Sequence, residues 1–159
     1  MKICFYFLLY LLLQNKFAVK MEFNQNGTLE PGIHKMRWEE FYNFFSFSEH
    51  RKILLWGLEK IYFSLREIGA THFYIDGSFV TSKKYPGDWD ACFDAPKHIL
   101  YEIRDKYLLP SRNKIKERYG GDLFYVDSEA DEYGLKFLDF FQQIKENPKK
   151  KKGIVELIY

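Results

Sequence analysis

The stretch FYIDGSFVTSKKYPGDWDACFD, residues 73–94, constrains the fold of this chain more than any other segment. It begins with a short apolar run, turns at Gly-Ser, passes through a polar loop with a Pro-Gly pair, and ends in a second apolar run. Two carboxylates, Asp88 and Asp90, stand one residue apart where the second run begins. The pattern predicts two strands joined by a turn and a loop, with both acids at the start of the second strand.

Both aspartates are expected on one face of that strand, because successive strand side chains point to opposite faces. Trp89 lies between them and should face the core together with Ala91 and Phe93. Two like charges on a half-buried strand are costly unless a cation compensates them. Either the strand begins in solvent and the acids are hydrated, or a cation binds between them.

The neighbouring turn favours the second interpretation. Mg²⁺ prefers oxygen ligands and is often held by one or two carboxylates together with substrate phosphates. Gly77 has no Cβ, so its backbone can approach a phosphate closely. Ser78 adds a hydroxyl and an N–H group at a turn, an arrangement suited to an anion. Lys83, in the following loop, is either a phosphate contact or an ordinary solvated residue.

The order of these parts resembles the nucleotidyltransferase superfamily, which has the fold of DNA polymerase β. Its signature is an apolar strand, Gly-Ser, about ten residues, Asp-x-Asp and a second apolar strand; here nine residues separate Ser78 from Asp88. Residues 23–159 also resemble a set of small uncharacterised bacterial proteins assigned to that superfamily. The shared segments are PGIHK-x-x-W-x-E-F at 31–41, DGSFVT at 76–81 and KGIV at 152–155.

The resemblance implies a magnesium-dependent enzyme that moves a nucleoside monophosphate from a nucleoside triphosphate to a hydroxyl of protein or RNA. It implies that Gly77 and Ser78 hold the triphosphate, and that Asp88 and Asp90 bind two Mg²⁺ ions. A third carboxylate is expected on a later, adjacent strand. Asp122 is favoured, because it enters its strand as Asp88 enters its own, and Asp127 at the far end is the alternative.

Two functions remain open. One is an active minimal nucleotidyltransferase in a bacterial toxin–antitoxin or defence module, a setting that the resemblance alone implies. The other is a catalytically inactive binding module of the same fold, either antitoxin-like or a nucleotide-sensing subunit. Nothing in the sequence resembles a separate acceptor-binding domain, so a protein partner or an RNA acceptor is expected.

The rest of the sequence predicts an α+β fold with a small sheet of about four strands and helices packed on it. Apolar residues make up 47% of the 159 residues, enough for one domain with a real core. A long helix is predicted from Glu49 to Ile68, capped by Ser48 and stopped by Gly69. Further expected elements are an extended arm at 22–35, helices at 36–47, 98–109, 111–119 and 135–144, a charged turn at 147–152, and strands at 71–75, 88–94, 122–126 and 153–159.

The first twenty residues carry an apolar run that is too short to span a bilayer as a helix. They are interpreted as an upstream extension or a signal-like segment, and residues 21–159 as a single nucleotidyltransferase-like domain. With only two cysteines and no zinc-ligand spacing, a cytoplasmic location without stable membrane association is expected.

Several charged residues have plain structural interpretations. Asp76 and Asp94 are expected to cap turns. The basic segment with Lys114, Lys116 and Arg118 is either a solvated helix face or a polynucleotide contact, and the four lysines at 149–152 are expected in a soluble turn.

Overall fold

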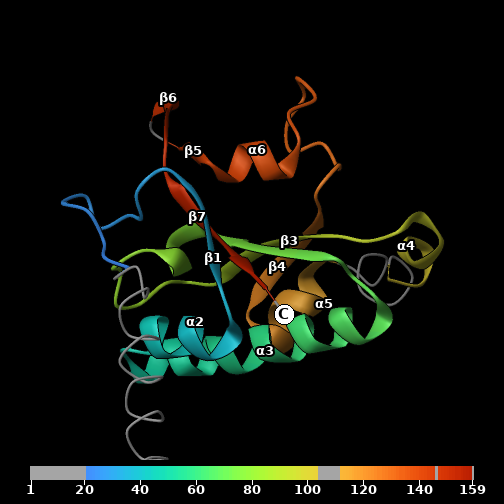
Figure 1. Cartoon of the computed structure of the whole chain (residues 1–159), viewed down its shortest axis with the longest axis horizontal. Coiled ribbons are helices and arrows are strands. Elements are labelled where there is room, and N and C mark those ends of the chain that lie inside the picture. Colours follow the sequence, from blue (N-terminus) through green and yellow to red (C-terminus); the bar gives the residue numbers. More distant parts are fainter. Residues whose placement is uncertain (1–20, 104–111, 146, 159) are drawn as a thin grey trace, which may run out of the picture.

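A five-stranded mixed sheet forms the centre of the molecule (Figure 1). The computed structural model describes residues 21–103, 112–145 and 147–158. The sheet order is β1-β7-β2-β3-β4, with β2 antiparallel to both β3 and β7, and with β1 and β4 parallel to their neighbours β7 and β3. The strands are β1 Gly32–Met36, β2 His72–Asp76, β3 Trp89–Asp94, β4 Gly121–Tyr125 and β7 Gly153–Leu157. The predicted α+β class is confirmed.

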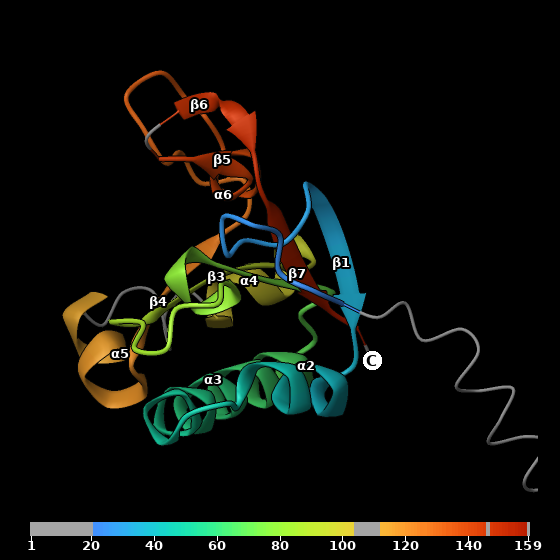
Figure 2. The same ribbon diagram turned by 90° about the vertical axis from the view of Figure 1, so that its left-hand side faces the viewer.

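Two helices, α2 Trp38–Phe45 and α3 Glu49–Ile68, cover one face of this sheet (Figure 2). The long helix α3 has the predicted limits. The Ser48 hydroxyl accepts the backbone N–H of Arg51 at 3.3 Å, and Gly69 ends the helix at a φ of 107°. The apolar stripe of α3 packs in the main core against the sheet face that carries Trp89 and Phe93, as expected from strand alternation.

The connection between the parallel strands β3 and β4 contains α4 Lys97–Ile103 and α5 Arg112–Tyr119. The end of α5 is held against both β3 and α3. The Trp89 indole N–H donates to the carbonyl of Tyr119 at 2.8 Å. Gly57 of α3 lies so close to that carbonyl that any side chain at position 57 would collide with it. These contacts fix the position of α5, and with it the position of Lys116.

A second, smaller layer lies on the opposite face of the sheet (Figures 1 and 2). It consists of α6 Phe137–Phe141 and a two-stranded hairpin, β5 Gln143–Ile144 and β6 Asn147–Lys151. Buried residues of the sheet and of α6 form a separate apolar cluster beneath it: Tyr74, Cys92, Val126, Phe141 and Ile154. The 3₁₀ turn η1, Gly77–Val80, follows β2 directly.

Three local predictions differ from the structure. The expected arm contains the edge strand β1, whose side chains are mostly exposed and therefore show no clear alternation. The predicted charged turn contains β6, a strand exposed along its whole length and held by backbone pairing with β5. The helix expected at 135–144 is shorter, because β5 begins at Gln143.

No helix within residues 21–103, 112–145 and 147–158 is long and apolar enough to cross a membrane. The interpretation of residues 1–20 and the expected boundary between the helices at 98–109 and 111–119 concern residues outside these ranges.

Candidate functional site

Three aspartates lie side by side across β2, β3 and β4. Asp90 of β3 is the register partner of Asp76 on β2 and of Asp122 on β4. The row faces away from α2 and α3, because the next residues on the same face, such as Cys92, belong to the second apolar cluster. Asp76 and Asp122 are buried, with 6% and 8% of their surface exposed, and Asp90 is partly buried.

The Gly-Ser turn lies directly against this row. Gly77 has a φ of 75°, in the left-handed region that favours glycine. A Cβ at this position would also collide with the carboxylate of Asp90. Position 77 therefore excludes a side chain for two independent reasons, and the backbone of the turn contacts the central acid of the row.

The surroundings of Asp90 disfavour its charged form. Burial, followed by the nearby charges of Asp88, Asp76 and Asp122, raises the pKa of Asp90 to about 6, with Lys116 acting in the opposite direction. Burial also raises the pKa of Asp76, although Lys152 counteracts this effect. The row is thus an acidic site that its own lysines only partly neutralise.

Two lysines contact the ends of the row and not its centre. The Lys116 ammonium contacts the carboxylate of Asp88 and lies 3.2 Å from Oδ2 of Asp122. The Lys152 ammonium lies 2.7 Å from Oδ1 of Asp76. Within the described part of the chain, no ion pair reaches Asp90. The central acid is therefore the one whose charge most needs a cation from outside the protein.

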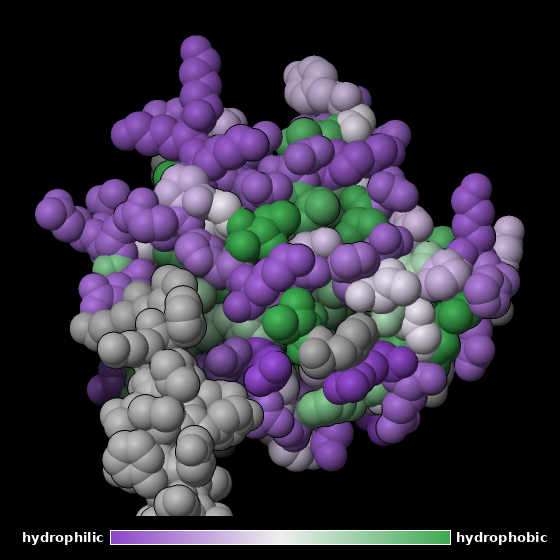
Figure 3. Space-filling model, in the orientation of Figure 1, coloured by the Kyte–Doolittle hydropathy of each residue, from purple (hydrophilic) through white to green (hydrophobic). Residues whose placement is uncertain are grey.

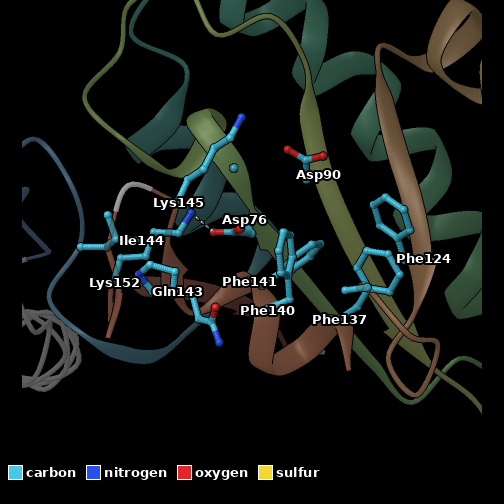
Figure 4. Close-up of a pocket in the computed structure, with 13 residues that line it drawn as sticks. Asp76, Asp90, Phe124, Phe137, Phe140, Phe141, Gln143, Ile144, Lys145 and Lys152 are labelled. Carbon is cyan, nitrogen blue, oxygen red and sulfur yellow. Dashed lines mark ion pairs between the residues drawn. The ribbon is translucent and has the colours of Figure 1, made fainter. Parts of the chain in front are cut away.

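A cavity of about 470 Å³ opens over Asp76 and Asp90 (Figure 4). Its walls come from the sheet, α6 and the β5–β6 hairpin. In Figure 4 the carboxylates of Asp76 and Asp90 and the Lys152 ammonium lie beside a group of aromatic rings. The aromatic lining consists of Phe124, Phe137, Phe140 and Phe141. One cavity thus combines acidic oxygens, an ammonium group and an apolar wall.

The structure brings four predicted site residues together, namely Gly77, Asp88, Asp90 and Asp122. Ser78 follows Gly77 within η1, and its carbonyl accepts the Thr81 hydroxyl at 2.7 Å.

The two remaining candidates lie apart from this group. Asp127 is exposed beyond the far end of β4, where the Tyr125 hydroxyl donates to it at 3.4 Å. Lys83 is exposed and is not among the residues that line the cavity. Asp122, not Asp127, is therefore the later carboxylate that adjoins Asp90.

Three residues of the site were not predicted from the sequence. Asp76 was expected to cap a turn, yet it is buried and lines the cavity beside Asp90. Lys116 was expected on a solvated helix face or in a polynucleotide contact, and Lys152 in a soluble turn, yet each contacts an acid of the site. Asp76 could have been found from strand alternation, since it precedes the turn on the face of Tyr74. No local signal marks either lysine, because Asp76 is distant from Lys152 in the sequence, and Lys116 meets Asp122, six positions away, only through the packing of α5 beside β4.

Arg51 of α3 was also not predicted from the sequence. Its side chain hydrogen-bonds to the Gly-Ser turn and to the loop that follows it. This buried side chain donates to the carbonyl of Phe45 at 2.6 Å, to that of Lys83 at 2.7 Å, and to that of Phe79 in η1. Burial lowers its pKa to about 10. Arg51 thus ties the Gly-Ser turn and the following loop to helix α3.

The carboxylates of the row suit a metal ion that is bound together with nucleotide phosphates. They suit less well a metal ion that is bound by the protein alone. Among the residues that the structure describes, no group of three or more His, Cys, Asp or Glu side chains converges closely enough to hold a metal ion. Mg²⁺, however, keeps water ligands and binds to proteins through one or two carboxylates together with substrate phosphates. Asp90, which lies between acids and has no ion pair of its own in the described part, fits this requirement.

The fold and the site together define a mixed α+β domain with a carboxylate row under an aromatic-walled cavity. The chain belongs to DUF6932, a family of unknown function, whose model matches residues 21–158. No curated protein and no solved structure matches the chain.

Proposed function

We propose that this chain is a magnesium-dependent minimal nucleotidyltransferase that moves a nucleoside monophosphate from a nucleoside triphosphate to a hydroxyl group. The observation that carries the proposal is the contact between the Gly-Ser turn and the central acid of an in-register carboxylate row. The resemblance of residues 73–94 to the nucleotidyltransferase signature supports it, and so does the adjoining cavity.

In this proposal Asp90 would hold Mg²⁺ together with the triphosphate, and Asp88 and Asp122, which do not converge with Asp90 on a metal ion in the described structure, would join it once the bound ion displaces Lys116. When bound, the metal ion neutralises charge on the phosphates. The Gly77–Ser78 turn contacts phosphate oxygens, and the Lys152 ammonium can leave Asp76 for the same anion. The acceptor oxygen bonds the α-phosphorus, the bond to the β-phosphate oxygen breaks, and pyrophosphate leaves. The hydroxyl proton passes to a carboxylate of the row.

One observation favours the second candidate, an inactive nucleotide-binding or antitoxin-like module. Lys116 contacts both Asp88 and Asp122 and so competes with a cation for their oxygens. In an active enzyme the nucleotide-bound metal ion must displace this lysine. In an inactive module the lysine would remain and neutralise the row permanently. Turnover that depends on Mg²⁺ distinguishes the two.

The cellular setting is part of the same proposal. The resemblance supports a role in a bacterial toxin–antitoxin or defence module, acting on protein or RNA, and the low cysteine content supports a cytoplasmic location. Association with a protein partner or an RNA acceptor is expected, since nothing in the sequence resembles a separate acceptor-binding domain.

Calorimetric titration of the full chain with each of the four nucleoside triphosphates, with and without Mg²⁺, tests the site. The proposal predicts magnesium-dependent binding that is lost in Asp90→Asn. Asp127→Asn is the matched control, because it removes the same charge outside the cavity. Binding that Asp90→Asn leaves unchanged, or no binding of any triphosphate, would remove the basis of the proposal.

A further inference from the structure

The β5–β6 hairpin carries an exposed basic surface next to the cavity. Lys149, Lys150 and Lys151 are all exposed on β6. The hairpin itself is a wall of the cavity, to which Ile144 and Pro148 contribute. Seen from the side of Figure 3, hydrophilic side chains dominate the end of the molecule where the hairpin lies in Figure 1. The lysines at 149–151 are therefore close to the mouth of the proposed active site.

These lysines form no ion pair with the residues that the structure describes. Within the ranges that the structure describes, no ion pair reaches any residue of 149–151, whereas Lys152 next to them pairs with Asp76. Successive strand residues point to opposite faces, so the side chain of Lys150 points away from those of Lys149 and Lys151. The three charges therefore lie on both faces of β6. A row of uncompensated cations at a cavity mouth attracts a polyanion that extends beyond the cavity.

The cavity that the hairpin helps to form also contains an exposed aromatic ring. Phe140 of α6 lines the cavity and has 44% of its surface exposed. Proteins that bind single-stranded nucleic acid combine cations along the backbone with aromatic side chains on which bases stack. Basic residues beside an exposed aromatic ring favour such a strand over an acidic peptide, which has no bases to stack.

We propose that the β5–β6 hairpin, through Lys149, Lys150 and Lys151, docks single-stranded RNA, and that a hydroxyl of this RNA is the acceptor of the transferred nucleotide. The identity of the reaction rests on the proposed function. The docking itself rests only on the hairpin, on its three lysines without an ion pair among the described residues, and on the exposed aromatic ring of the same cavity.

The test measures binding of a fluorescein-labelled oligoadenylate of about 12 nucleotides, within the range of known single-strand sites, by fluorescence anisotropy of the full chain. EDTA is present and nucleotide is absent, so docking is measured without the proposed reaction. Three phosphate contacts to a single strand predict a slope of about −2 for log affinity against log salt. Lys149→Gln/Lys150→Gln/Lys151→Gln should weaken binding at least tenfold at low salt and bring the slope towards zero.

The control, Lys52→Gln/Lys60→Gln/Lys97→Gln, removes the same charge from exposed positions on α3 and α4. It should retain the affinity and slope of the unaltered chain. Equal losses in both triple variants would mean that net charge alone attracts RNA, and would overturn the proposal. Absence of RNA binding would also overturn it, as would displacement of the RNA by polyglutamate at equal charge.

A second arm separates this proposal from the function on which it rests. With Mg²⁺ and nucleoside triphosphates, the oligoadenylate should gain a nucleotide, and the hairpin variant should lose this activity while still binding the triphosphate. RNA docking without triphosphate binding would refute the nucleotidyltransferase function and leave the docking surface intact. Triphosphate binding with no RNA docking would refute only the RNA assignment.

Discussion

Gly77 lies against the carboxylate of Asp90, so closely that a side chain at position 77 would occupy the space of that carboxylate. The two residues come from β2–η1 and β3, the two halves of the stretch at 73–94. The pairing of β2 with β3 therefore places the turn at Gly77 and the partly buried Asp90 in one site. The positive φ of Gly77 adds a second constraint on the same position.

The first prediction concerns Gly77→Ala. The substitution should lower the free energy of unfolding by about 1–3 kcal/mol, because alanine is strained at positive φ and its methyl group collides with Asp90. It should also abolish triphosphate binding. Gly87→Ala is the control, since a Cβ there meets no other atom within 4 Å and its φ is not positive. Denaturant unfolding of the two variants makes the comparison, and equal stabilities would contradict the account.

The second prediction concerns pH. Asp90→Asn should stabilise the metal-free protein by about 1–3 kcal/mol above pH 6, because it removes a buried charge that lies between other acids. The pKa of Asp90 is about 6 in the folded state and about 4 in the unfolded state, so protonated Asp90 favours folding.

The advantage of the variant should therefore shrink as the pH falls from about 6 to about 4, and vanish below about 4, where Asp90 is neutral in both states. Thermal unfolding of both proteins across this interval measures the difference. A stability difference between the two proteins that stays constant with pH would show that burial and the neighbouring acids do not destabilise the charged form of Asp90.

The third prediction concerns Lys116→Gln. Removing the ammonium frees the oxygens of Asp88 and Asp122, so Mn²⁺, used as a spectroscopic substitute for Mg²⁺, should bind several-fold more tightly. Lys114→Gln on the same helix is the control for the loss of one positive charge. Titration followed by electron paramagnetic resonance measures both affinities. If the two variants bind Mn²⁺ equally well, Lys116 does not compete for the site.

The fourth prediction concerns Arg51→Met. The substitution leaves three backbone carbonyls without their donor, and should cost about 3–5 kcal/mol of unfolding free energy. Lys52→Met, at the next and exposed position of α3, should cost less than about 1 kcal/mol. Hydrogen exchange should also report faster exchange of the loop at 79–84 in the Arg51 variant. A loop that exchanges at the same rate would mean that Arg51 does not hold it.

Local sequence signals predicted much of the fold. Ser48 and Gly69 mark the ends of α3 because capping and the left-handed stop depend on residues within one turn of the helix. Trp89 and Phe93 were assigned to the core because the strand period is two and their neighbours on the other face are acids. The strand β6 was missed because a run of lysines gives no periodicity, and only pairing with β5 makes it a strand.

The site could be predicted only where one segment contained it. Gly77 and Asp90 are 13 positions apart, and the order of strand, turn, loop and strand in this segment predicted that the two residues lie in one site. Lys116 joins Asp88 from a helix 28 positions away, and Lys152 joins Asp76 from the far end of the chain. Such contacts depend on the sheet order and on how α5 is fixed against α3, and neither is encoded in a local pattern.

The most direct test of the central claim is turnover. The full chain is incubated with Mg²⁺, each nucleoside triphosphate and the oligoadenylate, and pyrophosphate release is measured beside that of Asp90→Asn, Asp122→Asn and Asp127→Asn. The account predicts magnesium-dependent release that is lost in the first two variants and retained in Asp127→Asn. Release that Asp90→Asn leaves unchanged would contradict it, and so would binding of both the triphosphate and the oligoadenylate with no release.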